Sequence, residues 1–180
     1  MRDGAGSGPG ARPEAGGDLD RLRAVAGGVG DPEIPVLTLD DLGIVRDVRR
    51  GDGDLAGTVL VDLTPTYTGC PATEVIAADV TAALRAAGAD RVLVRTVLSP
   101  AWTTDWISEA GRRKLREYGS APRSAGRPPG PHRVALTLSA RCPWCGSGRT
   151  REVSRFGATP CRSHWTCRSC LEPFDSFKAI

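Results

Sequence analysis

The apolar residues in the middle of the chain follow a pattern that predicts a strand, a helix and a second strand. Residues 58–63 are rich in apolar and β-branched residues and contain no breaking residue, as is typical of a buried strand. A helix that stops at Gly88 is expected next, because one stripe at helical spacing carries Ile76, Val80, Ala83, Leu84 and Ala87. Residues 91–98 form a second apolar run, and the two strands could be parallel neighbours in a β-α-β unit.

Further elements are expected on both sides of this unit. In chain order they are a helix capped by Asp18, a non-helical turn at 31–35, a strand at 44–48, a hairpin turn at 51–53 and a helix from Thr103 or Thr104 to Tyr118. The hairpin turn makes the strand at 44–48 antiparallel to a strand at 55–63. The sequence therefore predicts an α+β fold, in which helices pack against a small mixed sheet.

Composition divides the 180 residues into four segments. Gly, Ala, Pro and charged residues dominate the beginning of the chain, and Pro, Gly, Ser and Arg dominate a later segment without large apolar residues. We expect a disordered tail at 1–17, an α+β domain at 18–119, a linker at 120–132 and a cysteine module at 133–180 that begins with a strand at 133–138. The tail has no apolar run typical of a signal peptide or membrane span, which predicts a cytoplasmic protein.

The cysteine module has the spacing of a metal site. Two C-x2-C pairs with 21 intervening residues can supply four thiolates to one tetrahedral ion, and they are Cys142, Cys145, Cys167 and Cys170. About 40 residues bury too little apolar surface to fold alone, whereas structural zinc supplies roughly 10–16 kcal/mol. We therefore predict structural zinc, although Cys161 or His164 could replace a ligand and iron or a cluster could occupy the site. Alternatively, Cys161 could be a free thiol serving chemistry.

Cys70 lies where the first strand ends and the helix begins. With Pro71 at the first helical position, Cys70 becomes the N-cap, in front of unpaired backbone N–H groups. The helix dipole contributes roughly 0.3–1 kcal/mol, which is less than the ~1.4 kcal/mol that equals one pKa unit. Cys70 should therefore stay protonated at neutral pH unless a cation or metal lies close. A small helix-capping residue is the simpler alternative.

Net charge differs between the two ends of the chain. Residues 1–110 hold 10 Lys and Arg against 17 Asp and Glu, whereas residues 111–180 hold 14 against 4, so the net charges are −7 and +10. A basic half of this size could meet nucleic acid, an acidic protein or a phosphate-bearing ligand, or it could be merely solvated.

Two groups of motifs resemble known families. Asp31-Pro-Glu-Ile-Pro35, Asp41-Leu-Gly43 and the segment 63–71 around Cys70 resemble the domain of cytosolic iron-sulfur assembly factors and their bacterial relatives, of the MIP18-like and SufT-like type. The module from Cys142 to Lys178 resembles the PaaD branch of that family, the accessory proteins of the phenylacetyl-CoA epoxidase, a ring 1,2-monooxygenase of aerobic phenylacetate degradation.

This resemblance implies a non-catalytic maturation factor for the metal or iron-sulfur centres of that oxygenase. It implies that the oxygenase and reductase subunits are the partners, that Cys70 is the reactive cysteine, and that Asp31 and Glu33 lie in the signature loop for metal delivery. A transient iron or iron-sulfur cluster would then be the cargo. Pro160 and Arg162 beside Cys161 depart from the pattern of this branch.

Two other classes of function remain open. An enzyme acting on an acyl-CoA would use Cys70 as its nucleophile with Asp31 or Glu33 nearby, although the sequence shows no Ser/His/Asp set and no phosphate-binding glycine motif. A nucleic-acid-binding zinc ribbon would use the basic half and would bind with a strong dependence on salt. We expect neither nucleic acid nor a membrane as partner.

Overall fold

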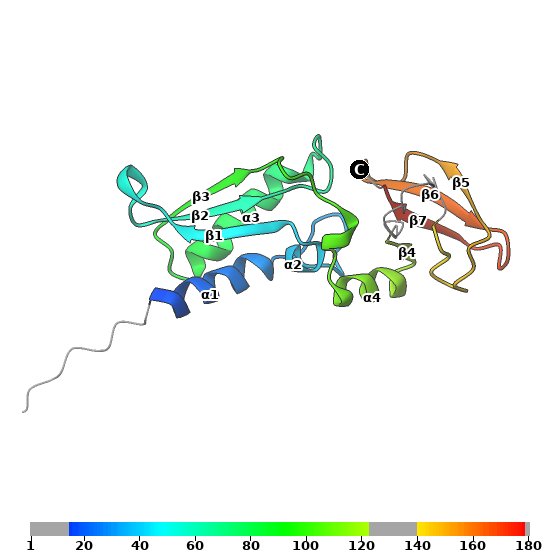
Figure 1. The fold of residues 1–180 in the computed structure, drawn as a ribbon, viewed down its shortest axis with the longest axis horizontal. Coiled ribbons are helices and arrows are strands. Elements are labelled where there is room, and N and C mark those ends of the chain that lie inside the picture. Colours follow the sequence, from blue (N-terminus) through cyan, green and yellow to red (C-terminus); the bar gives the residue numbers. More distant parts are fainter. Residues whose placement is uncertain (1–14, 123–139, 179–180) are drawn as a thin grey trace, which may run out of the picture.

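The computed structural model describes residues 15–122 and 140–178 of the chain. Two small sheets lie end to end, with helices packed on the first sheet (Figure 1). The fold is therefore α+β with a β-rich C-terminal part, as predicted. The expected strand at 133–138 and most of the expected linker and tail lie outside the described residues.

The first sheet has the order β1-β2-β3 and contains the predicted β-α-β unit. Its strands are β1 (Val45–Arg50), β2 (Thr58–Leu63) and β3 (Arg91–Thr96). β2 is antiparallel to β1 and parallel to β3, as the sequence pattern predicts. Every second residue of β2 points into the core, so that Val59, Val61 and Leu63 are at most 2% exposed. Asp62, between Val61 and Leu63 in the strand, points to the opposite face, where its carboxylate accepts hydrogen bonds from Arg49 and Arg95.

Helices α1 (Ala15–Gly27) and α3 (Ala72–Ala86) contact this sheet. On α3 the predicted stripe is buried at Ile76, Val80 and Leu84. α1 begins three residues before Asp18, so Asp18 lies in the first turn of the helix, where it binds Arg21 and Arg50, and does not cap it. No helix in the described ranges combines the length and the apolar character needed to cross a membrane.

The helix predicted from Thr103 to Tyr118 is instead two elements. A 3-10 turn, η2 (Thr104–Trp106), is capped by Thr103, and α4 (Glu109–Glu117) has its own N-cap at Ser108. The chain is extended at Ile107, between the two. The hairpin also differs, because a 3-10 turn, η1 (Gly53–Leu55), lengthens its loop and β2 starts at Thr58.

The second sheet has the order β4-β7-β6-β5. It consists of β4 (Ser120–Ala121), β5 (Thr150–Ser154), β6 (Arg162–Cys167) and β7 (Pro173–Phe177). We call β5, β6 and β7 with their connecting turns and residues 140–149 the ribbon. β4 was expected to be linker, yet it pairs in parallel with β7 and both its residues are buried.

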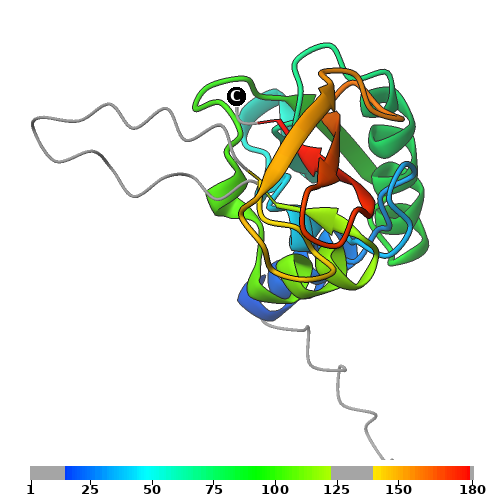
Figure 2. The ribbon, with the colours of Figure 1, turned by 90° about the vertical axis from the view of Figure 1, so that its right-hand side faces the viewer.

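We call the first sheet with helices α1 to α4, within residues 15–119, the first unit. The ribbon packs against one end of it (Figures 1 and 2). Phe177 and Cys161 of the ribbon belong to the same buried cluster as the residues of α3 and β2. The ring of Phe177 lies 6.0 Å from that of Trp102, and Trp102 donates to the carbonyl of Leu42. The two units therefore share a hydrophobic core.

Asp41 connects α4 with the loop that follows α1. It lies in α2 (Leu39–Leu42), a short helix that the sequence pattern did not predict, and completes a capping box with Thr38. Its carboxylate accepts hydrogen bonds from Lys114 (2.6 Å) and from Ser108 (3.2 Å). Gly111 permits the close approach of α4, because a Cβ there would lie 2.6 Å from the Asp41 carbonyl oxygen.

We predict that Asp41→Ala lowers the free energy of unfolding by about 2 kcal/mol, since a buried charged acceptor with several donors is lost. Burial alone would raise the pKa of Asp41, but Lys114, Thr38 and Ser108 lower it below its ordinary value. Because the pKa of Asp41 is lower in the folded than in the unfolded state, its ionised carboxylate stabilises the fold above the unfolded-state pKa of about 4. This stabilisation is lost as the pH falls through the folded-state pKa. The difference between parent and variant should therefore shrink on acidification.

Urea denaturation of the parent and of Asp41→Ala, at neutral and at acidic pH, measures this difference in the free energy of unfolding. Asp47→Ala is the matched control, because Asp47 is half exposed and its carboxylate forms a surface ion pair with Arg49, which contributes little. Equal destabilisation by the two substitutions at neutral pH would contradict the role given to Asp41.

Candidate metal and thiol sites

A small cavity lies between the first unit and the ribbon and brings together residues from three parts of the sequence. Its volume is about 20 Å³. Its polar lining includes Asp31 and Glu33 from the loop at 31–35, Cys70 and Thr66 from the segment after β2, and Cys161 from the ribbon. Apolar side chains complete the wall, among them Ile34, Ile44, Ile76 and Phe177. We call this the thiol cavity.

The two acidic residues of the loop have different roles. An oxygen of Asp31 accepts hydrogen bonds from the backbone N–H groups of Glu33 (2.9 Å) and Ile34 (2.7 Å), which holds the turn closed. Glu33 is thereby aimed at the cavity. Burial raises the pKa of Glu33, and the charge of Asp31 raises it further, while Arg162 acts in the opposite direction. Asp31 therefore positions the loop, and Glu33 is the carboxylate that faces the thiols.

Cys70 lies just before α3, as the sequence predicts. The helix begins at Ala72, and Pro71 is its N-cap residue but already has helical angles, φ −65° and ψ −23°. The predicted capping position is thus displaced by one residue. Burial raises the pKa of the Cys70 thiol, and the hydrogen bond from the backbone N–H of Ala72 offsets this only in part. The thiol therefore stays protonated at neutral pH without a cation, in agreement with the estimate made from the helix dipole.

Cys161 is the residue of the cavity that sequence reasoning did not place. It is 6% exposed, and its sulfur lies 4.0 Å from Oε2 of Glu33 and 3.1 Å from Oγ1 of Thr159. Burial raises the pKa of this thiol as well. Cys161 was expected either as an alternative ligand for the ribbon metal or as a free thiol. It lies outside the four-cysteine group and lines the thiol cavity instead. A single cysteine outside both C-x2-C pairs was the only available signal.

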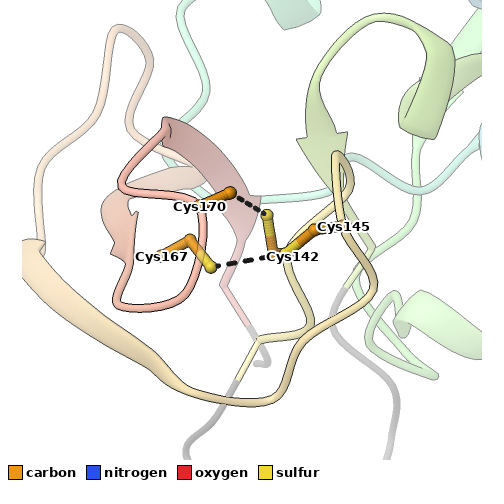
Figure 3. A group of neighbouring side chains, drawn as sticks. All are labelled: Cys142, Cys145, Cys167 and Cys170. Carbon is orange, nitrogen blue, oxygen red and sulfur yellow. Dashed lines mark hydrogen bonds between the residues drawn. The ribbon is translucent and has the colours of Figure 1, made fainter.

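The four cysteines of the two C-x2-C pairs converge in the ribbon (Figure 3). Cys142 and Cys145 come from the turn before β5, and Cys167 and Cys170 from the end of β6 and the turn that follows it. All four sulfur atoms lie within 4.8 Å of one another, and the pairs Cys142–Cys170 and Cys145–Cys167 are separated by 3.6 Å. Tetrahedral zinc with Zn–S bonds of about 2.3 Å requires S···S separations of about 3.8 Å. The four-sulfur group therefore fits such an ion.

The electrostatics of the four-sulfur group also favour a cation. Backbone N–H groups of Cys170 and Ser169 point at the sulfur of Cys167 and lower its pKa to about 6. The N–H of Glu172 acts similarly on Cys170, but burial and the neighbouring thiols outweigh it and raise the pKa of Cys170 to about 12. Without an ion, the four thiols cannot all ionise together. A divalent cation would remove this repulsion.

His164 lies outside the four-sulfur group. It faces Asp175 across the β6–β7 pair, with Nδ1 3.2 Å from Oδ1. The basic residues of α4 differ in their surroundings. Arg112 is occupied by the carbonyls of Ile107 and Thr104, whereas Arg116 lines a surface pocket together with Cys142 of the four-sulfur group. Among the described residues, the four cysteines are the one cluster of three or more His, Cys, Asp or Glu with metal-ligand spacing.

Comparison with known proteins agrees with this division of sites. Residues 19–94 match the iron-sulfur cluster assembly protein domain, and residues 126–178 match the PaaD zinc β-ribbon domain. The chain is 46% identical over 163 residues to the D subunit of the putative 1,2-phenylacetyl-CoA epoxidase of Escherichia coli K12, covering 90% of this chain and 93% of the relative.

Two solved structures are also similar to the chain. A domain of unknown function, DUF59, from Bacillus anthracis is 25% identical, with a TM-score of 0.49, covering 56% of this chain and 92% of that one. A Mycobacterium tuberculosis protein associated with Fe–S complex assembly and repair is 33% identical, with a TM-score of 0.34, covering 62% and 98%. The match to the E. coli epoxidase subunit extends over nearly the full length of both chains. Together with both domain matches, it shows that the chain belongs to the PaaD family.

Proposed function

We propose that this protein is a non-catalytic accessory factor that matures or maintains the metal or iron-sulfur centres of a 1,2-phenylacetyl-CoA epoxidase. The observation that carries the proposal is the 46% identity to the E. coli epoxidase subunit over nine-tenths of both chains. The match of residues 19–94 to an iron-sulfur cluster assembly domain supports the delivery role. The oxygenase and reductase subunits of the epoxidase are the proposed partners.

The thiol cavity is the proposed site of delivery. Cys70 would hold the iron or cluster cargo, since its sulfur is half-buried at the junction of cavity and solvent. Glu33 would hold the cation from the opposite side, and Asp31 keeps the loop in place. A protonated thiol binds a soft metal by giving up its proton, so that the cargo itself makes Cys70 anionic.

The environment of Cys70 argues against an acyl-CoA enzyme. An acting nucleophile needs a depressed pKa or a base in hydrogen-bond reach, whereas burial raises the pKa of Cys70 and the nearby charges of Glu33 and Asp31 are negative. His164, the histidine among the described residues, binds Asp175 in the ribbon. The cavity thus favours holding a cation over attacking a carbonyl group.

The ribbon metal has a structural role in this proposal. Cys142, Cys145, Cys167 and Cys170 would hold zinc, which is closed to substrate when four protein sulfurs bind it. The ribbon positions Cys161 and Phe177 against the first unit. Zinc would therefore act on the thiol cavity indirectly, by keeping the ribbon folded.

We predict that Cys167→Ser abolishes the zinc site and unfolds the ribbon, because three thiolates and an alcohol bind zinc far more weakly. Zinc content should fall from one ion per chain to near zero, and amide exchange should accelerate throughout 140–178 while the strands of the first sheet stay protected. Elemental analysis and hydrogen-exchange mass spectrometry measure both effects. The control is Cys161→Ser, which changes a cysteine outside the four-sulfur group and should keep its zinc. Full zinc in Cys167→Ser with loss in Cys161→Ser would refute this ligand set.

We predict that Cys70→Ala impairs delivery without impairing folding. The side chain is small and only half-buried, so the variant should melt within a few degrees of the parent and keep its zinc. In cells that express the epoxidase with this variant as the only copy of the chain, iron in the purified oxygenase and its ring-epoxidising activity should fall about tenfold or more, as expected for loss of a ligand.

Thr68→Ala is the matched control for this experiment. Thr68 lies in the same loop and is exposed, but it does not line the thiol cavity. It should support a fully loaded oxygenase. If Cys70→Ala also supports a fully loaded and fully active oxygenase, Cys70 is only a residue at the start of a helix and the delivery role is wrong.

A further inference from the structure

We propose that Cys161 is a second thiolate ligand in the thiol cavity, so that Cys70, Cys161 and Glu33 together bind one divalent transition-metal ion between the first unit and the ribbon. This rests on the proposed delivery function and names the ligands of its cargo. Cys70 and Glu33 come from the first unit, whereas Cys161 comes from the ribbon. The site is therefore complete only when the two units are packed together.

The backbone of the ribbon fixes Cys161 at the cavity. Its carbonyl accepts the backbone N–H of Lys178 (2.9 Å), and the ammonium of Lys178 donates to the carbonyl of Pro160 (2.7 Å). These bonds lock the start of β6 to the end of β7, next to the docked ring of Phe177. Cys161 is thus held in place by packing and by the sheet, as a ligand must be if it is to bind without a large rearrangement.

One distance in the cavity, between the sulfur of Cys161 and the carboxylate of Glu33, is close to that of a metal site. Cys70, Cys161 and Glu33 as a set lie wider apart than metal-ligand spacing, so binding of an ion would draw them together. The sulfur of Cys161 lies 4.0 Å from Oε2 of Glu33, although 128 residues separate them in sequence. In a tetrahedral site with bonds of about 2.3 Å to sulfur and about 2.1 Å to oxygen, these two atoms would be about 3.6 Å apart. A movement of a few tenths of an ångström would bring them into range.

The cavity volume selects a single ion. A space of about 20 Å³ holds approximately one water-sized sphere. A cluster with two irons and two bridging sulfides would require the ribbon to move away from the first unit. The packed structure therefore fits one ion with a fourth ligand from water or from an acceptor protein.

The types of donor atom indicate the class of metal. Two thiolates favour zinc, iron or Cu(I), whereas a carboxylate favours harder divalent ions. The mixed set suits Fe²⁺ and its spectroscopic substitute Co²⁺. Both thiols lose a proton on binding, which leaves two thiolates and a carboxylate around a divalent cation with a net charge of −1.

Arg162 can offset this remaining charge. It is 6% exposed, its Nε donates to Oγ1 of Thr159 (3.0 Å), and its positive charge acts on both Glu33 and Cys161. Asp175 shares the guanidinium at 3.5 Å, so Arg162 is held in position from both sides. A buried cation of this kind lowers the cost of gathering three anionic ligands in one cavity.

Cobalt titration of the reduced, zinc-loaded full chain under anaerobic conditions tests the inference. The parent should bind one Co²⁺ with a sulfur-to-cobalt charge-transfer band in the near ultraviolet. Cys161→Ser should keep its ribbon zinc, lose about half of that band and bind Co²⁺ on the order of 10–100-fold more weakly. Glu33→Gln should weaken binding while keeping the band. Glu74→Gln is the matched control, because Glu74 is an exposed carboxylate in the first turn of α3 and does not line the cavity.

A second measurement requires no substitution. One equivalent of Co²⁺ should slow alkylation of Cys70 and Cys161 in parallel, as followed by mass spectrometry of the zinc-loaded parent. Protection of Cys70 alone, or an unchanged cobalt band in Cys161→Ser, would overturn the two-thiolate site and leave the delivery role of Cys70 intact. Absence of any charge-transfer band in the zinc-loaded parent would overturn the site altogether. Failure of the delivery function itself would show separately, as a fully loaded oxygenase with Cys70→Ala.

Discussion

Phe177 belongs to the last strand of the ribbon, yet its ring is buried in the core of the first unit, where it packs against Trp102. Burying one phenylalanine contributes about 1.5–3 kcal/mol. The ribbon needs this contact, because the second buried cluster is small. It comprises Ala121 of β4 and, from the ribbon, Ala140, Cys142, Trp165, Cys167 and Phe174. Two of these six residues are proposed metal ligands. In the proposed function, the ribbon would therefore be stabilised by a metal at one end and by docking at the other.

The same contact determines what the first unit can do chemically. Without the ribbon, the cavity that Cys70 and Glu33 line would lose Phe177 and Cys161 from its wall. With the ribbon docked, Phe177 and Cys161 close one wall and the pKa values of Cys70, Cys161 and Glu33 all rise because of burial. Burial disfavours charge of either sign, so the anionic forms of these three side chains and a cation would be stable in the cavity only as neutralising partners. Packing of the ribbon and the proposed metal binding would thus involve the same side chains.

The sequence predicted those elements that depend on the pattern of neighbouring residues in the chain. The apolar, β-branched run of β2 and the stripe on α3 were sufficient for the β-α-β unit, and the C-x2-C pairs were sufficient for the convergence of four cysteines. The break between η2 and α4 was missed because Trp106 and Ile107 continue an apolar pattern, whereas the signal was the cap at Ser108. Cys161 could not be placed, because its position follows from long-range packing and not from spacing. Ser120 and Ala121 carry no strand signal, and only pairing with β7 makes them a strand.

That short strand has a consequence for how such proteins can diversify. β4 follows α4 directly in the chain, but its hydrogen bonds are made to β7 of the ribbon. A ribbon exchanged between relatives by recombination would lose an edge strand if the crossover fell after Ala121, and the first unit would keep a strand without a partner. A crossover at Gly119, whose left-handed backbone (φ +77°) follows α4, would instead keep β4 with the ribbon. The boundary between the units is therefore set by hydrogen bonding and lies before the Pro- and Arg-rich segment that composition alone would choose.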